Sequence, residues 1–135
     1  MKPRPKKKSP KRSSIVRKLD AEFSRYIRNR YAKNEIAECF TCGRKDHWKK
    51  LQCGHFMSRR FYSTRWSETN CQVQCYVCNI TRYGEQFTFG LKLDQKLKGS
   101  AEEMQKLSRI ISKFSNVDLL EKHAYYKNLN KSFGI

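Results

Sequence analysis

The sequence has no long hydrophobic run. No window approaches the roughly 20 consecutive apolar residues that a membrane-spanning helix needs, and the mean hydropathy is −0.87. The basic N-terminus is not followed by an apolar stretch, so it lacks the pattern of a secretory signal. These absences predict a protein that is neither embedded in a membrane nor secreted.

Proline is missing from most of the chain, because all three prolines lie within residues 1–14. That segment carries seven basic side chains, no acidic one and no apolar periodicity. We expect a disordered basic tail that holds phosphates without regard to base sequence. Two other interpretations stay open: a tail that only aids solubility, and a nuclear address at residues 6–12.

Acidic side chains are scarce. The 135 residues contain 12 Asp and Glu against 30 Lys and Arg, a formal net charge of +18. Such an excess indicates a polyanionic partner, and nucleic acid is the commonest one. Aromatic residues make up 13%, too many for a wholly disordered chain. Outside the tail, the largest excess lies in residues 39–84, with eight basic and two acidic side chains.

Apolar residues at helical spacing flank a central segment that has none. The first helix is expected at 15–38. A later helix is expected to begin at a capping box of Ser100 and Glu103 and to run to Phe114, and a third to be capped by Asn116. The sequence thus predicts an α+β protein that is mostly helical. Its expected parts are a tail (1–14), a helix (15–38), a zinc-bound module (39–90) and C-terminal helices (91–135).

Six cysteines concentrate in the central segment, and four of them form C-x-x-C pairs, Cys39 with Cys42 and Cys75 with Cys78. This spacing lets both thiolates of a pair reach one tetrahedral Zn²⁺ at about 2.3 Å. Without an export signal the compartment is expected to be reducing, which favours metal over disulfides. We therefore predict one structural Zn²⁺ held by the four cysteines.

The other two cysteines, Cys53 and Cys71, lie between the pairs. One interpretation makes them small buried apolar residues. The other is a second metal site that they form with His47 or His55. The sequence leaves both open.

Three further residues are of the types that phosphodiester cleavage requires: His55 in a β-like run, Asn70 in the returning loop, and Asn79 directly after Cys78. Cleavage needs a base to activate water, a group that aims the base, and a cation at the leaving oxygen. Zinc would hold the predicted hairpin against the following helix, so that the three side chains converge. This order predicts a ββα-metal, or H-N-H, nuclease module.

Four short motifs carry a resemblance to a known family. They are Cys39-Phe40-Thr41-Cys42-Gly43, Cys53-Gly54-His55-Phe56, Thr64-Arg65-Trp66 with Glu68 and Asn70, and Gln74-Cys75-x-x-Cys78-Asn79. In these motifs the segment resembles the NinG, or Rap, recombination proteins of lambdoid phages. That family is described as structure-specific endonucleases acting on D-loops and Holliday junctions. The resemblance implies a DNA endonuclease in the cytoplasm of the infected bacterial host, with phage recombination proteins as further partners.

The resemblance also assigns roles by position. It implies that structural zinc is bound by Cys39, Cys42, Cys75 and Cys78. His55 would be the general base, Asn70 would orient His55, and Asn79 would bind a catalytic Mg²⁺ or Mn²⁺. The chain departs from many H-N-H sites at Gly54, where an Asp would bind the metal. Hard cations prefer carboxylates, and Glu68, Glu85 and Asp46 all stay open as replacements.

Basic and aromatic residues alternate after His55. We expect Arg59, Arg60 and Arg65 to bind phosphates beside the scissile bond, and Tyr62 or Trp66 to stack on an unpaired base. In the other interpretation, Trp66 and Phe61 belong to the core and only the arginines face DNA. Symmetrical cutting of a junction needs two sites, which predicts a homodimer formed through the flanking helices. The competing hypothesis is a zinc-stabilised nucleic-acid-binding protein without catalysis.

Overall fold

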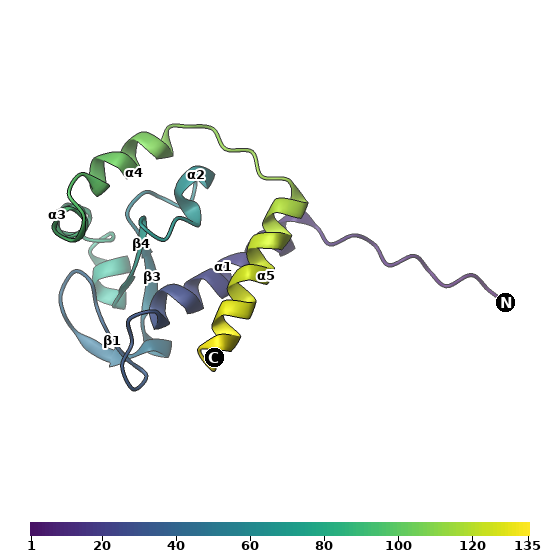
Figure 1. Cartoon of the computed structure of the whole chain (residues 1–135), viewed down its shortest axis with the longest axis horizontal. Coiled ribbons are helices and arrows are strands. Elements are labelled where there is room, and N and C mark those ends of the chain that lie inside the picture. The colour runs from purple at the N-terminus through teal and green to yellow at the C-terminus, as the bar shows by residue number, and fades with distance from the viewer.

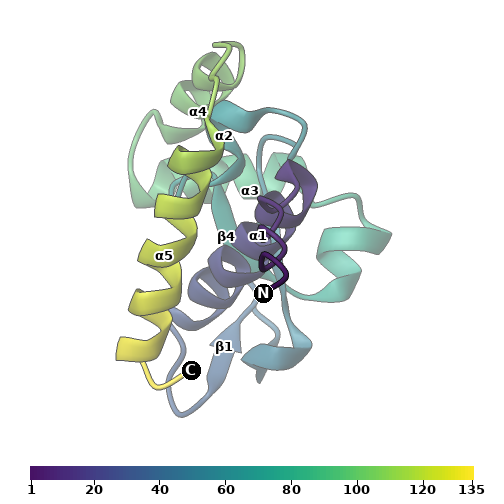
Figure 2. The same ribbon diagram turned by 90° about the vertical axis from the view of Figure 1, so that its right-hand side faces the viewer.

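Two helices that are far apart in the sequence lie side by side in the computed structural model, which describes residues 1–135. They are α1 (Arg12–Asn29) and α5 (Asn116–Ser132), and Figures 1 and 2 show them in contact. Helix α1 buries one stripe of residues three and four positions apart: Ile15, Val16, Leu19, Phe23 and Ile27. This stripe meets Leu119 and Tyr126 of α5 in the larger core cluster. Each large side chain buried there contributes roughly 1.5–3 kcal/mol.

Two small antiparallel sheets occupy the middle of the chain. One pairs β1 (Ile36–Glu38) with β2 (Lys45–His47), and the other pairs β3 (Gln52–His55) with β4 (Cys71–Gln74). A 3₁₀ turn at Trp48–Lys50 links the sheets along the chain. Both sheets contribute to a second core cluster, and three of its members are cysteines. The cluster consists of Ala37, Cys39, Trp48, Leu51, Val73, Cys75 and Cys78.

Short helices complete the fold. They are α2 (Tyr62–Arg65), a π-helical turn (Val77–Thr81), α3 (Gln86–Lys96) and α4 (Ser100–Ser108). About half of the chain is helical, so the prediction of an α+β protein is confirmed. None of the helices has the length and apolar character needed to span a membrane. Residues 1–11 are exposed, form no helix or strand, and point away from the rest of the molecule (Figure 1).

Several predicted helix limits are wrong. Helix α1 stops at Asn29 and does not reach residue 38, since Asn34 and Glu35 adopt left-handed backbone angles and the chain then enters β1. The expected capping box at Ser100 does not form, since α4 begins after the left-handed Gly99 and the Ser100 hydroxyl donates to Leu97.

A capping box does occur at the start of α5. There the Ser115 hydroxyl accepts from the Asp118 N–H, and the Asp118 carboxylate accepts from the Ser115 N–H. Ser115 is therefore the N-cap of α5, in place of the predicted Asn116, which is the first helical residue. Helix α4 also ends at Ser108 and does not reach Phe114.

Candidate functional site

The four predicted zinc ligands come together from two places in the chain. Cys39 and Cys42 lie in the turn between β1 and β2, and Cys75 and Cys78 lie where β4 leads into the π-helical turn. The four Sγ atoms lie within 4.8 Å of one another. Gly43 closes the first turn with a φ of +79° and donates its N–H to the Cys39 carbonyl. We call these four residues the four-cysteine cluster.

The ionisation of these thiols fits a divalent metal. Burial opposes the ionisation of Cys39, but hydrogen bonds from the Thr41 hydroxyl and from backbone N–H groups lower its pKa to about 6. Burial raises the pKa of Cys78 to about 12. A bound cation would stabilise the thiolate form of all four residues, because metal ions bind the deprotonated form of cysteine. The four-cysteine cluster could hold a structural Zn²⁺.

The cluster also connects the two sheets. The Phe40 N–H donates to the Val73 carbonyl at 2.8 Å. The buried Gln74 side chain donates to the Thr41 hydroxyl at 3.1 Å and to the Gly84 carbonyl at 2.9 Å. A metal at the cluster would therefore fix the β3–β4 hairpin relative to the residues that follow it.

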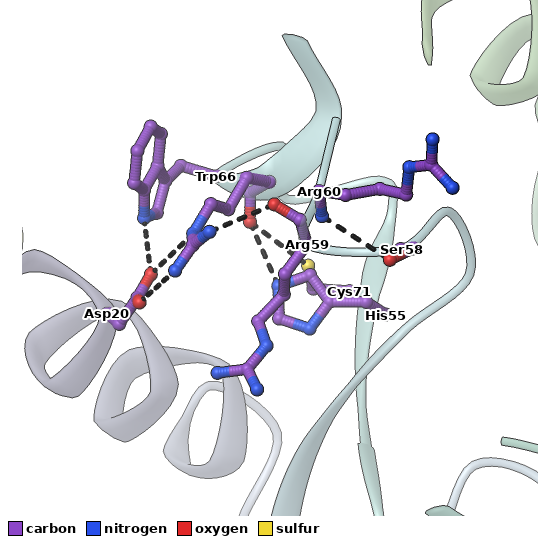
Figure 3. A network of polar contacts seen from close by, with 8 residues as sticks. Asp20, His55, Ser58, Arg59, Arg60, Trp66 and Cys71 are labelled. Atoms are coloured by element: carbon purple, nitrogen blue, oxygen red, sulfur yellow. Dashed lines mark hydrogen bonds and ion pairs between the residues drawn. The ribbon is translucent and has the colours of Figure 1, made fainter. Parts of the chain in front are cut away.

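His55 ends strand β3 and is largely enclosed. Its Nε2 donates to the backbone carbonyl of Arg65 at 3.0 Å, and Figure 3 draws this contact as a dashed line from the His55 ring. Burial lowers the pKa of His55, so the ring is neutral at neutral pH. In a neutral ring with the proton on Nε2, Nδ1 is free to accept a proton.

Asn70 is fully buried and makes no hydrogen bond to His55. Its Oδ1 accepts from the Met57 N–H at 2.7 Å, and its Nδ2 donates to the carbonyls of Met57 and Thr64. The expected direct orientation of His55 by Asn70 is therefore absent. The Arg65 carbonyl holds the ring, and Asn70 holds the adjacent Thr64 carbonyl, so any effect of Asn70 on His55 passes through the backbone.

Asn79 lies in the π-helical turn and donates its side-chain N–H to Gln52 Oε1 at 2.7 Å. Asn79 and His55 both line one cavity of about 640 Å³, which we call the His55 cavity. Of the three residues predicted to carry the chemistry, the structure thus brings these two to the same cavity.

A protein-family model described as "Bacteriophage Lambda NinG protein" matches residues 2–133. The chain belongs to this family. Membership implies a role related to phage recombination. No curated protein and no solved structure matches the chain.

The basic and aromatic residues after His55 divide into two groups in this NinG-family protein. Arg59 and Arg60 are exposed. Arg65 instead forms an ion pair with Asp20 of α1 and also donates to the Arg59 carbonyl (Figure 3). Tyr62 packs against the core, with its ring edge-on to Trp66 at 5.2 Å. Arg65 and Tyr62 are therefore engaged within the fold.

None of the three carboxylates considered from the sequence lines the His55 cavity. Glu68 accepts from the Tyr126 hydroxyl, Glu85 lies beside Arg82, and Asp46 lies beside Arg44.

The carboxylate that lines the His55 cavity is Asp20. The sequence did not indicate this role, because Asp20 lies within the helical pattern of α1. Its two oxygens accept from the guanidinium of Arg65 and from the indole N–H of Trp66. An acidic residue on the polar side of an amphipathic helix gives no local signal that it faces a distant histidine.

Proposed function

We propose that this protein is a structure-specific DNA endonuclease of the H-N-H type that cuts branched recombination intermediates such as D-loops and Holliday junctions. The observation that carries the proposal is the His55 cavity, which is lined by a neutral histidine, by Asn79 and by the exposed Arg59. The order of elements supports it: two antiparallel strands, β3 and β4, are followed by a helical turn that starts at the four-cysteine cluster. Family membership agrees with a role in recombination.

In this proposal each residue has a limited task. His55 Nδ1 takes a proton from the water that attacks the phosphorus atom, the bond to the leaving oxygen breaks, and that oxygen takes up a proton from solvent. The exposed Arg59 at the cavity edge and Arg60 beside it bind the phosphates of the DNA strand. The Arg65 carbonyl keeps the ring of His55 in one orientation.

The catalytic Mg²⁺ or Mn²⁺ implied by the resemblance does not find a matching set of ligands. Hard cations bind carboxylates and water oxygens, and the carboxylate lining this cavity, Asp20, already accepts from Arg65 and Trp66. We therefore assign no step to such an ion. This mismatch also favours the second candidate function, a zinc-stabilised DNA-binding protein without catalysis.

Replacement of His55 tests the enzyme proposal. The wild-type chain, His55→Ala and the control His123→Ala are incubated with D-loop, Holliday-junction and linear duplex DNA in the presence of Mg²⁺ or Mn²⁺. We expect His55→Ala to cut branched DNA at least about 100-fold more slowly, the usual contribution of a general base. Binding measured by mobility shift should be unchanged, and His123→Ala should cut like the wild type.

Two results would contradict this assignment. Equal cutting by His55→Ala and the wild type would remove His55 as the base. Binding of branched DNA without cutting, with either cation, would favour the non-catalytic candidate.

Tyr83 is a better candidate for base stacking than Tyr62. It lines the His55 cavity, and its side chain is 89% exposed. Its φ of +53° is a conformation that aromatic residues rarely adopt, within a turn closed by hydrogen bonds of Gly84 to Cys78 and Gln74. The backbone therefore presents this ring to solvent at the edge of the cavity.

We predict that Tyr83→Asn weakens binding to branched DNA by about 10-fold, because stacking on one base contributes roughly 1–3 kcal/mol. Asn tolerates the left-handed conformation, so the free energy of unfolding should change little. Fluorescence anisotropy with junction and duplex DNA measures the effect, and Tyr125→Asn, on an exposed tyrosine of α5, is the control. Equal losses for both variants would contradict a specific role for Tyr83.

The proposed partners are branched DNA and a second copy of the chain. The apolar faces of α1 and α5 pack against each other, so a homodimer through these helices would use their outer surfaces. Val117 and Leu120 are exposed on α5 and are available for such a contact. Light scattering on the free protein and on its junction complex measures the molar mass, which shows whether two copies of the chain associate.

A further inference from the structure

A second cluster of metal-binding side chains lies around His55. Cys53, His55 and Cys71 each offer one ligand atom, and these atoms lie within 4.8 Å of one another. We call this group the thiol–imidazole cluster. It shares no residue with the four-cysteine cluster, and it contains His55 in place of His47, the other histidine considered from the sequence.

The pairing of β3 with β4 produces this arrangement. Cys53 and His55 are two residues apart on β3, so they lie on the same face of the strand. The register places Cys71 of β4 directly opposite His55. Two of the ligands therefore come from β3 and the third comes from the paired strand β4. The hydrogen-bonded pairing of the two strands keeps the spacing of the ligands rigid.

The donor atoms are those that a soft cation prefers. Two thiols and an imidazole suit Zn²⁺, whereas Mg²⁺ and Mn²⁺ favour oxygen ligands. Two sulfur atoms bound to one tetrahedral Zn²⁺ at about 2.3 Å lie about 3.8 Å apart, so little movement of these side chains is required.

The surroundings of the cluster are also those of a metal site. The Arg65 carbonyl accepts from a ring nitrogen of His55 at 3.0 Å. Metal-bound histidines usually donate their second ring N–H to such a carbonyl or to a carboxylate. Cys53 and His55 line the His55 cavity, which provides a path for an ion to the buried Cys71.

We propose that the thiol–imidazole cluster is a second Zn²⁺ site, and that filling it stops DNA cutting by occupying His55. Binding of one Zn²⁺ releases one proton from each thiol, and the imidazole enters as the neutral ring. A metal-bound His55 no longer accepts the proton of the attacking water. The regulatory half of this proposal rests on the proposed function, and the metal site itself does not.

Metal stoichiometry tests the site without reference to cutting. The full chain is titrated with Zn²⁺ against a chromophoric chelator, and with Co²⁺ to follow thiolate-to-metal absorption. We expect two metal ions per wild-type chain and one for Cys53→Ser, His55→Ala and Cys71→Ser. Because losing even an outer contact weakens metal binding about 10–100-fold, loss of a direct ligand should exceed this. His47→Ala is the matched control and should keep both ions.

A wild-type chain that binds a single ion overturns the site, as does a Cys53→Ser chain that still binds two. Cys53 is only partly buried, so Cys53→Ser remains informative if Cys71→Ser does not fold.

Cutting assays then test the regulatory role. The second equivalent of Zn²⁺ should reduce cutting of a Holliday junction at least about 100-fold in the wild type, the contribution of its base. The same addition should not change the cutting rate of Cys53→Ser relative to that variant's own rate before the addition. Cutting by the wild type that is unchanged or increased overturns the regulatory role. If the chain cuts no DNA at all, the nuclease proposal and its regulation fail together, while the count of bound ions still decides the second site.

Discussion

Chelation of the metal at the four-cysteine cluster is expected to unfold the part of the protein built around it. Cys39, Cys75 and Cys78 belong to the smaller core cluster, which otherwise has only four buried apolar residues. Structural zinc contributes about 10–16 kcal/mol to the folding of zinc-finger peptides at neutral pH. The larger core between α1 and α5 contains none of these cysteines, so helical structure there should persist longer.

The variant Cys75→Ser provides the same test without a chelator. We expect it to lower the free energy of unfolding by several kcal/mol and the Tm by more than about 10 °C. Tyr76→Ser is the matched control, because it makes the same substitution in the exposed neighbouring side chain, outside both clusters of metal-binding residues, and should change the Tm little. Circular dichroism melting measures both, and restored zinc should reverse the effect of chelation. A Tm that is unchanged after the metal is removed would contradict a structural role.

Introducing a carboxylate before His55 is expected to destabilise the protein strongly. Many H-N-H sites have Asp at this position, and here it is Gly54. A Cβ at Gly54 would collide with Gln74 Oε1 and would lie 2.6 Å from Cδ and 2.9 Å from Cγ of the same side chain. Gln74 would have to move away, which breaks its hydrogen bonds to Thr41 and Gly84. Leaving such buried groups unpaired costs about 1–3 kcal/mol each.

We therefore predict that Gly54→Ala and Gly54→Asp each lower the free energy of unfolding by about 3–5 kcal/mol, combining overpacking with the lost hydrogen bonds. Urea unfolding measures this. In a double-mutant cycle, Gln74→Ala should remove most of the additional cost of Gly54→Ala, because the side chain that blocks the Cβ is then absent. Additive effects of the two substitutions would contradict the proposed contact.

The same contact accounts for glycine at the position where the resemblance to H-N-H sites implies an Asp. Gly54 and Gln74 lie on the opposite face of the β3–β4 hairpin from His55, since neighbouring residues on a strand point to opposite sides. The buried Gln74 joins the hairpin to the four-cysteine cluster through Thr41. Space that an Asp would need is thus used to attach the hairpin to the rest of the protein.

Predictions from the sequence agreed with the structure where short-range spacing governs the outcome. The C-x-x-C spacing placed each pair of thiols in one tight turn, and the fold brings the two turns together. The apolar stripe from Ile15 to Ile27 is the buried face of α1. The end of α1 was predicted less well, because Asn34 and Glu35 adopt left-handed angles that side-chain periodicity does not reveal.

Residues with charged or aromatic side chains were harder to place. Arg65 and Tyr62 follow His55 in a run that suggested DNA contacts, yet Arg65 pairs with Asp20 and Tyr62 packs on Trp66. Whether an arginine binds a phosphate or an internal carboxylate depends on what the fold places beside it. Here that neighbour is Asp20, which lies 45 positions away in the sequence.

The sequence by itself determined the two C-x-x-C pairs, the amphipathic character of α1 and the excess of positive charge, because these depend on composition and on spacing within a few residues. Only the tertiary structure decided which residues share the His55 cavity. Pairing of β3 with β4 set Cys71 against His55, and docking of α1 brought Asp20 to the cavity. These contacts join segments that are far apart in the sequence, and the local pattern of one segment carries no information about the other. The residues therefore become neighbours only when the chain folds.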